Sequence, residues 1–299
     1  MELLVVGSVA MDSVDTPHGS VRDVLGGAAV YFSAAARHFT RPRMVGVVGR
    51  DFPEEYLKRI KKLADTDGLE VGDGETFRWW GAYTGDMNSA VTKEVHLNVL
   101  ADFRPKLPQA WASSRFAFLA NASPQTQMKV LKQLRKPKFV MADTMNLWIE
   151  HERMALLKLM KRVDALVVND AEARMLSGMD SLIKACGWIR SKGPRLVVVK
   201  KGEHGAMLSG DGLHFVWPGY PTADVVDPTG AGDSFAGGFM GYLAAGGKVD
   251  ARQLKMALVH GQVVASFNIE SFSMNRLEVL RWSELNARLR RFVKMMSLE

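Results

Sequence analysis

The chain has 299 residues, a formal net charge of +7 at pH 7, 47% hydrophobic residues and 24% charged residues. This ordinary globular composition excludes disordered and low-complexity architectures. The single cysteine, Cys186, excludes an internal disulfide and a thiolate-rich metal site. Its place in an apolar helical pattern predicts a small buried side chain rather than a reactive thiol.

The positive charge raises the question of an anionic partner. Basic residues at 58–62 and 288–294 alternate with apolar residues at helical spacing, as on solvated helix faces. No zinc-finger spacing, RNA-recognition motif or heptad array accompanies them, so we expect no nucleic-acid partner and only a general attraction for anions such as nucleotides. Residues 1–7 lack the pattern of a signal peptide and no apolar stretch approaches 18 residues, so we expect a cytoplasmic protein without a membrane partner.

Short apolar runs alternate along the chain with helical patterns. We predict buried strands at residues 3–6, 45–48, 116–119, 139–141, 166–168 and 196–199. Between several of them, apolar residues recur three and four positions apart, which predicts helices. Alternation of helices with continuously apolar strands indicates an α/β fold, in which helices flank both faces of a mostly parallel sheet.

Two segments break this alternation. Residues 9–25 are polar and rich in turns, and residues 76–103 alternate in the manner of strands. We predict that these segments form a small β-sheet that stands off the large sheet and acts as a lid. Because no linker rich in Pro, Gly or Ser separates them from the rest, we expect one domain over residues 1–299.

The most informative stretch is residues 227–239, DPTGAGDSFAGGF. Gly230, Ala231 and Gly232 carry almost no side chain, and a helical pattern follows them. A glycine-rich turn that opens a helix presents unpaired amides and the positive end of the helix dipole, which together form an anion site. Asp233 in the first turn stabilises the helix, and beside bound phosphate it can also take a proton from an attacking hydroxyl.

The Asp-x-x-Gly-Ala-Gly-Asp sequence that ends at Asp233 resembles, in full, the C-terminal signature of the ribokinase-like (PfkB) carbohydrate and nucleoside kinases. The resemblance extends over most of the chain. It implies a Rossmann-like domain with a β-lid, ATP as phosphoryl donor, Mg²⁺ bridging the phosphates, and a hydroxymethyl group as acceptor. In that setting Asp233 is the general base, and the amides of Gly230, Ala231 and Gly232 form the anion hole.

Two segments near the N-terminus match the family's substrate-binding motifs. Asp12 follows the first strand where the family's Asp contacts sugar hydroxyls, but Ala10 stands where an Asn is common. Gly26 and Gly27 resemble the family's Gly-Gly-x-x-x-Asn, with Tyr31 at the Asn position. The resemblance therefore assigns substrate contacts to Asp12, Gly26, Gly27 and Tyr31; a loop carboxylate and a glycine turn are the competing interpretations.

Three further segments resemble the nucleotide site. Asn169 and Glu172 match the family's Asn-x-x-Glu, which organises Mg²⁺ and its waters, although the same spacing also makes a helix capping box. Lys200, Gly202 and Gly205 lie in a loop similar to the family's ATP loop. His260 lies where the family builds part of the adenine pocket, and an ordinary helix position is the alternative.

Other polar residues carry weaker resemblances. Asp227 and Thr229 match positions that bind a monovalent cation, such as K⁺, in some members. Asp143 and Asn146 follow a predicted strand and could order water or phosphate, or cap a turn. Residues 49–51 match a Gly-x-Asp of the family and fit a structural turn equally well.

The acceptor is the least determined feature. Residues 86–88, Asp-Met-Asn, together with Tyr31 and the aromatic run at 77–80, look most like a nucleoside kinase-like subgroup. Because aromatic rings can stack on a base, we favour a nucleoside over a simple sugar, although such rings also fill lid interfaces. A catalytically silent nucleotide- or nucleoside-binding module and a homodimer formed through the lid remain open.

Overall fold

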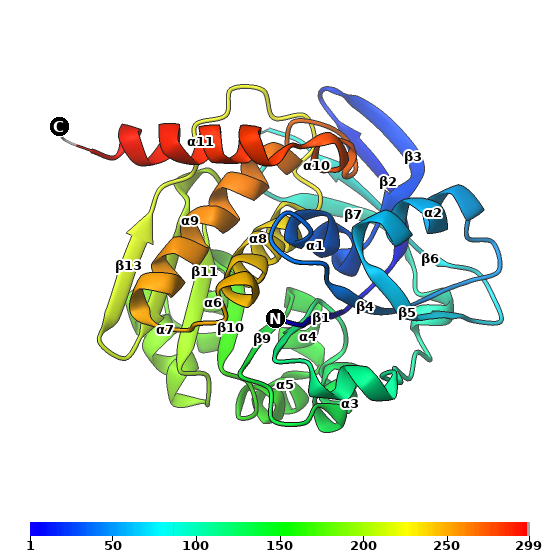
Figure 1. The fold of residues 1–299 in the computed structure, drawn as a ribbon, viewed down its shortest axis with the longest axis horizontal. Coiled ribbons are helices and arrows are strands. Elements are labelled where there is room, and N and C mark those ends of the chain that lie inside the picture. The colour runs from blue at the N-terminus through cyan, green and yellow to red at the C-terminus, as the bar shows by residue number, and fades with distance from the viewer. Residues whose placement is uncertain (86, 298–299) are drawn as a thin grey trace.

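The computed structural model describes residues 1–85 and 87–297 of the chain (Figure 1). The predicted residues 86–88 thus lie partly outside the described part, at Asp86. The main sheet contains β1 (Leu3–Val6), β4 (Arg43–Val48), β5 (Asp65–Val71), β8 (Phe116–Leu119), β9 (Phe139–Asp143), β10 (Ala165–Asn169), β11 (Leu196–Lys200), β12 (Ala206–Gly210) and β13 (Leu213–Trp217).

The strand order within the described residues is β13-β12-β11-β10-β9-β8-β1-β4-β5. Each strand from β11 along the sheet to β5 pairs in parallel with its neighbours in that stretch. The hairpin β12–β13 continues the sheet beyond β11 in antiparallel pairing. All six predicted strands lie in this sheet, although β5, β12 and β13 were not predicted. The predicted α/β fold with a mostly parallel sheet is confirmed.

Helices cover both faces of the sheet, as continuously apolar strands require (Figure 1). In β1, Leu3 and Val5 pack into one core layer while Leu4 and Val6 pack into the other. The first layer is covered by α1 (Ala28–Ala36), α2 (Glu54–Leu63), α8 (Ala231–Gly246), α9 (Ala251–Asn268), α10 (Asn275–Val279) and α11 (Trp282–Met295).

The second layer is covered by α3 (Pro124–Gln133), α4 (Asn146–His151), α5 (Arg153–Met160), α6 (Asp170–Ser177) and α7 (Leu182–Ser191). Cys186 lies fully buried in α7, which confirms the prediction of a small core side chain. Among the described helices, none is long and apolar enough to cross a membrane.

The strand order indicates which edge of the main sheet is expected to bind ligands. The chain adds β4 and β5 on one side of β1 and then returns to add β8 on the other side. Parallel sheets bind ligands at the carboxyl ends of their strands, near such a reversal of strand order. Asp143, Asn169 and Lys200 are the last residues of β9, β10 and β11 and therefore meet at this edge.

A second, four-stranded sheet is built by the two predicted segments within the described residues. Its order is β3 (Gly19–Gly26), β2 (Ala10–Thr16), β6 (Phe77–Tyr83), β7 (Ala90–His96). Strand β2 pairs in parallel with β6, and the two outer pairings are antiparallel. The action of this sheet as a lid stays a prediction, as does the single-domain organisation.

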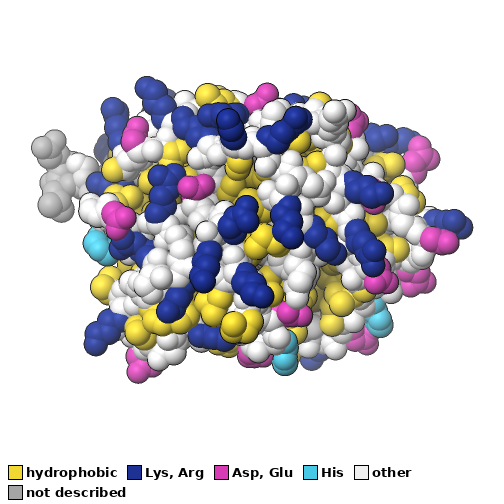
Figure 2. Space-filling model, turned by 90° about the horizontal axis from the view of Figure 1, so that it is seen from below, with side chains coloured by type: hydrophobic (Ala, Val, Ile, Leu, Met, Phe, Trp, Pro, Cys, Tyr) yellow, Lys and Arg dark blue, Asp and Glu magenta, His cyan; other side chains and the backbone are white. Residues whose placement is uncertain are grey.

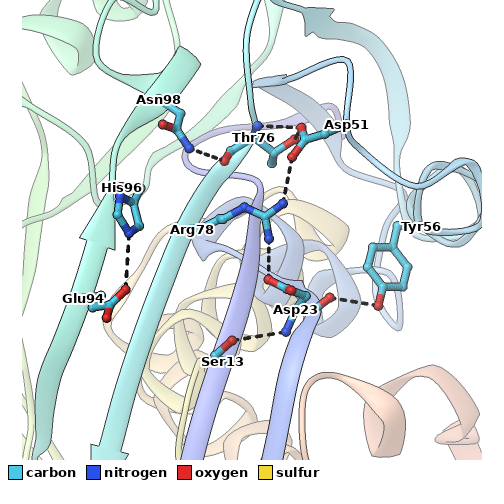
Figure 3. Close-up of polar contacts among 9 residues, drawn as sticks. All are labelled: Ser13, Asp23, Asp51, Tyr56, Thr76, Arg78, Glu94, His96 and Asn98. Carbon is cyan, nitrogen blue, oxygen red and sulfur yellow. Dashed lines mark hydrogen bonds and ion pairs between the residues drawn. The ribbon is translucent and has the colours of Figure 1, made fainter.

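A polar network joins the small sheet to the main domain (Figure 3). Asp51, which follows β4, accepts hydrogen bonds from the amide and hydroxyl of Thr76, both 2.7 Å, and from Nη2 of Arg78, 2.9 Å. Arg78 also pairs with Asp23 on β3, whose carbonyl accepts from the Tyr56 hydroxyl of α2 at 3.0 Å. Asp51 thus fixes the point where the chain enters β6, as the turn interpretation of residues 49–51 expects.

Candidate active site

The glycine-rich turn opens α8 as the sequence predicts. Gly230 is the N-cap residue with φ of 73°, a left-handed conformation that glycine adopts without strain. The Ser234 amide donates to the Gly230 carbonyl at 2.8 Å, and the Ala231 amide donates to the Pro228 carbonyl at 3.1 Å. In the described part of the chain, the Gly232 amide has no backbone carbonyl partner. The helix dipole and this amide are the features from which an anion site at the start of α8 is predicted.

The Asp233 carboxyl interacts with charged side chains from both sheets. Burial raises the pKa of its carboxyl to about 7, and the nearby Asp143 carboxylate raises it further, whereas Lys200 lowers it. Asp233 in turn contributes to the raised pKa of Asp12 on the other side. The general-base candidate therefore stands between two groups of side chains, one from the small sheet and one from the carboxyl ends of β9 to β11.

Asp12, Gly26 and Gly27 meet at the pairing of β2 with β3. A Cβ atom on Gly26 would lie 1.9 Å from Oδ2 of Asp12, so this carboxylate occupies the space that a side chain would take. The Gly27 amide donates to Asp12 and lowers its pKa, but burial outweighs this contact and raises the pKa to about 7. Asp12, Gly26 and Gly27 are therefore packed against one another, and Asp12 is the ionisable residue among them.

Tyr31 packs against the anion site from α1. A Cβ on Gly230 would lie 2.2 Å from Cγ of the Tyr31 ring, so the ring covers the glycine turn. The side chain is 1% exposed, and its hydroxyl has no hydrogen-bond partner within residues 1–85 and 87–297. Burial raises the pKa of this hydroxyl, and the charges of Asp12, Asp227 and Asp233 add to the effect. The hydroxyl is therefore a buried donor directed among carboxylates.

Lys200 provides the positive charge of the site. Its Nζ lies 3.4 Å from Oδ2 of Asp143, and a Cβ on Gly232 would lie 2.9 Å from the same Nζ. Burial lowers the pKa of this ammonium, but the carboxylates of Asp143, Glu172 and Asp233 outweigh it and raise the pKa overall. The Lys200 ammonium thus stays charged beside Gly232.

Asn169 and Glu172 form a complete capping box at the start of α6. The Glu172 amide donates to Oδ1 of Asn169, and the Asn169 amide donates to Oε2 of Glu172, both at 2.7 Å. Burial raises the pKa of Glu172 to about 7, with Asp143 raising and Lys200 lowering it. The capping-box interpretation of Asn169 and Glu172 is therefore confirmed. The Glu172 carboxyl is also close enough to Lys200 and Asp143 for both charges to affect its pKa.

Gly202 and Gly205 shape the loop between β11 and β12. Both have positive φ, 53° and 89°. A Cβ on Gly205 would lie 2.1 Å from the Trp217 carbonyl oxygen, so close backbone packing alone requires glycine there. A Cβ on Gly202 would lie 2.6 Å from Oδ1 of Asn88, which brings the β6–β7 turn against this loop.

Asp227 joins two loops at the base of α8. Its carboxylate accepts from the Thr229 amide at 2.9 Å and from the Ser273 amide at 3.3 Å. The Thr229 hydroxyl lies 3.4 Å from the hydroxyl of Tyr83 on β6. In the described chain, no group of three or more His, Cys, Asp or Glu side chains could hold a metal. The monovalent-cation role of Asp227 and Thr229 therefore stays a prediction.

His260 is not brought to this cluster. Its ring stacks on Tyr242 with centroids 4.4 Å apart and meets Phe39 edge-on at 5.3 Å. Tyr242 is nine residues beyond Asp233 on α8, which corresponds to about 13 Å along the helix axis. Burial lowers the pKa of His260 to about 4, so the ring is neutral. The predicted adenine contact of His260 stays a prediction. Asn146 likewise lies exposed at the start of α4.

Two residues of the site were not singled out for it from sequence. Tyr83 reaches Thr229, and a tyrosine in an alternating strand gives no sign of that contact. The Gln127 amide nitrogen donates to the carbonyls of Leu119, Ala120 and Asp143 at 3.0, 3.0 and 2.8 Å. Gln127 thus holds the ends of β8 and β9 together beneath Asp143. A buried glutamine on an amphipathic helix carries no sequence signal for this role.

Comparison with known proteins shows which sequences this chain resembles. The sequence profile of the pfkB family carbohydrate kinases matches residues 2–278. Cytidine kinase from Thermococcus kodakarensis is 30% identical over 250 residues, which cover 81% of this chain and 88% of that protein.

Solved structures share the fold. Burkholderia thailandensis nucleoside kinase in complex with inosine superposes with a TM-score of 0.77 at 19% identity, covering 98% of this chain and 99% of that one. An Escherichia coli protein described as a putative ribokinase II, in complex with ATP and Mg²⁺, gives 0.80 at 16% identity, with 97% and 99% covered.

Proposed function

The chain belongs to the pfkB family of carbohydrate kinases, and from that premise we propose that its acceptor is a nucleoside. As a member of this family, the protein is an ATP-dependent kinase that phosphorylates an alcohol group of a nucleoside or sugar. The observation that carries the proposal is the Trp79 indole on the same side of the small sheet as Asp12. The charges of Asp12 and Lys200 near Asp233 support the phosphoryl transfer itself.

The residues divide the reaction between them. Asp12 accepts hydrogen bonds from acceptor hydroxyls, and the unpartnered Tyr31 hydroxyl donates one to the same molecule. Asp233 removes the proton of the attacking hydroxyl as that oxygen bonds to the terminal phosphorus of ATP and the bond from this phosphorus to the ADP oxygen breaks, so that ADP leaves. The Gly232 amide, the α8 dipole and the Lys200 ammonium stabilise the charge on the transferring phosphoryl group. Closure of the small sheet excludes water.

The carboxylates near Lys200 fit a hard cation. Mg²⁺ keeps several waters and binds one or two carboxylates together with substrate phosphates, so few protein ligands are needed. Glu172 and Asp143 offer such oxygens beside Lys200 and Asp233. A Mg²⁺ ion held there would supply positive charge against the phosphates. We infer that Glu172 would contact the hydration shell of Mg²⁺. Asp227 and Thr229 are the residues that would hold K⁺.

A flat aromatic surface supports a nucleoside acceptor. Trp79 on β6 pairs with Asp12 on β2, and paired residues of adjacent strands point to the same side of a sheet. A Cβ on Gly81 would lie 2.1 Å from the Trp79 ring, so the indole lies over this glycine. Trp80 points to the opposite side, where its Nε1 donates to Asp15 at 2.6 Å. Trp79, and not Trp80, can therefore stack on a base near Asp12.

Substitution of these two tryptophans separates the roles. Because stacking contributes about 1–3 kcal/mol per base, W79A is expected to raise the KM for the nucleoside by about 5- to 150-fold with little change in kcat. W80A loses a contact on the far face and is the matched control. Steady-state kinetics at saturating ATP measure both. Equal KM values for the two variants would remove Trp79 from the acceptor site.

The raised pKa values predict a steep acidic limb in the pH profile. Asp12 and Asp233 each have a pKa of about 7, and both act as ionised carboxylates. Since kcat/KM reports the free enzyme, it should fall below pH 7 with a slope on a logarithmic plot steeper than that of one proton. D12N should make the limb shallower. The range from about pH 5.5 to about pH 8 spans the pKa values of both carboxyls. A constant kcat/KM over this range would contradict the roles of Asp12 and Asp233 as ionised carboxylates.

An acceptor panel tests the proposal itself. ADP release is measured with Mg-ATP and each of several nucleosides, ribose and fructose, and the phosphorylated product is identified by mass spectrometry. A nucleoside monophosphate as the favoured product supports the proposal. A sugar phosphate would identify a simple-sugar kinase, and tight nucleoside binding without ADP release would identify a silent binding module.

A further inference from the structure

The positive charge of the chain is concentrated in two segments. Residues 103–142 contain eight Lys or Arg and no Asp or Glu, and residues 153–163 contain four and none. The rest of the chain therefore has 27 of the 39 basic residues against all 32 acidic ones. Without these two segments the protein would be net acidic.

The fold brings the two segments together on one side of the molecule. Helix α3 packs against α5, and the Lys138 amide donates to the Arg115 carbonyl at 2.6 Å. The amide of Gln133 on α3 donates to the Pro105 carbonyl at 2.9 Å, which holds residues 104–106 beside the helix. We call this surface the basic face: the Lys and Arg side chains of residues 103–142 and 153–163.

Most charged groups of the basic face extend into solvent, whereas Lys138 Nζ donates to the Gly247 carbonyl at 2.5 Å and Arg153 donates to the Leu176 carbonyl at 2.6 Å. All Lys and Arg residues of this face except Arg153 are exposed, and none forms an ion pair with any residue in 1–85 or 87–297. Figure 2 shows the side of the molecule where α3 and α5 lie, with Lys and Arg side chains spread across it and fewer acidic ones between them. Asp102, Glu150, Glu152 and Asp164 flank the segments in sequence.

The basic face lies away from the catalytic edge of the sheet. Arg115, Lys138 and Arg162 precede β8, β9 and β10, whereas Asp143 and Asn169 end β9 and β10. The length of the strands, about 15 Å, therefore separates this end of the face from the phosphate site. Neither ATP nor the acceptor explains its charge.

We propose that the basic face binds the phosphate backbone of a nucleic-acid strand without sequence preference. Lysine and arginine side chains that displace condensed counterions supply such binding, and base contacts are not needed. A lipid surface fits less well, because only Met154 among the described residues of the two segments is a large exposed apolar side chain. This inference departs from the expectation of no nucleic-acid partner, which rested on the helical spacing of basic residues at 58–62 and 288–294 and on the absence of known nucleic-acid-binding motifs.

Salt-dependent binding of labelled RNA tests this proposal. Fluorescence anisotropy of a single-stranded RNA of about 20 nucleotides, longer than common single-strand sites, is measured over a range of KCl concentrations. The wild-type chain should bind with a Kd of about 1–100 μM near physiological salt. K129E/K132E/K136E removes three exposed charges of the basic face, and R290E/R291E/K294E makes the same change of net charge on α11 as the matched control.

The two variants distinguish RNA binding by the basic face from RNA binding that depends only on the net charge of the protein. The basic-face variant should lose most of its affinity, and its salt slope should fall by about 2, since each phosphate contact to a single strand contributes about 0.7. The α11 variant should keep its slope, and both should keep kinase activity, which also shows that they fold. Should K129E/K132E/K136E fail to fold, K129Q/K132Q/K136Q replaces it. Equal loss in both variants, no RNA binding by the wild type, or binding only to vesicles containing phosphatidylserine would overturn the proposal.

Discussion

Replacement of Asp233 by Asn is expected to lower kcat by about 10²–10⁴-fold while the Kd for ATP stays close to that of the wild type. The amide has nearly the shape of the carboxylate but cannot take the proton of the acceptor hydroxyl. The backbone amides of α8 and the Lys200 ammonium remain in place, so the nucleotide still finds its anion site. Rapid-quench turnover and isothermal titration with ATP give the two quantities.

A second Asp-to-Asn change controls for the loss of charge. Asp250 caps α9, where its Oδ1 accepts from the Gln253 amide at 2.9 Å, and Asn is an equally good cap. D250N should therefore leave both turnover and stability unchanged. Turnover by D233N within about threefold of the wild type, a barrier change of under 1 kcal/mol, would refute the assignment of Asp233 as the base.

Loss of the Lys200 charge is expected to have the second-largest effect. K200M removes a cation beside the Gly232 amide, and removal of one such group costs about 10²–10³-fold in kcat. The same change leaves Asp143 and Glu172 without their counter-charge. Because Lys200 also lowers the pKa of Asp233, its loss should move the acidic limb of the kcat/KM profile to higher pH.

Three variants distinguish catalysis from folding at this position. K200R keeps the charge and should recover part of kcat. K201M changes the neighbouring lysine and should behave like the wild type. K200M/D143N removes both members of this pair and should restore part of any lost stability, since Asp143 is then no longer an unpaired buried charge, but it should not restore kcat. An unmoved pH profile in K200M would limit Lys200 to a structural role.

Local sequence was enough for features that depend on neighbours in the chain. The glycines before Asp233 predict a turn and a helix start, and the structure has Gly230 at the N-cap with positive φ. The six apolar runs predict strands because each is buried on both sides. Both conclusions use only the residue types within a few positions.

Features that depend on strand order or helix rotation could not be predicted. Lys200 meets Asp143 only because β9, β10 and β11 are consecutive in the sheet, which no local pattern encodes. Helix rotation sets the other limit: α9 is buried on most sides, so its sequence does not say whether His260 faces the nucleotide, and that contact stays a prediction. The excess of positive charge in residues 103–142 and 153–163 is visible in the sequence, but only tertiary packing brings the two segments together as the basic face.

The most direct test is a crystal structure of the protein with Mg²⁺, a non-hydrolysable ATP analogue and the favoured nucleoside. The account predicts the acceptor hydroxyl about 2.6–3.2 Å from an Asp233 carboxylate oxygen, with the terminal phosphate against the Gly232 amide and Lys200. A nucleoside bound with its hydroxyl away from Asp233, or a terminal phosphate remote from the start of α8, would contradict it.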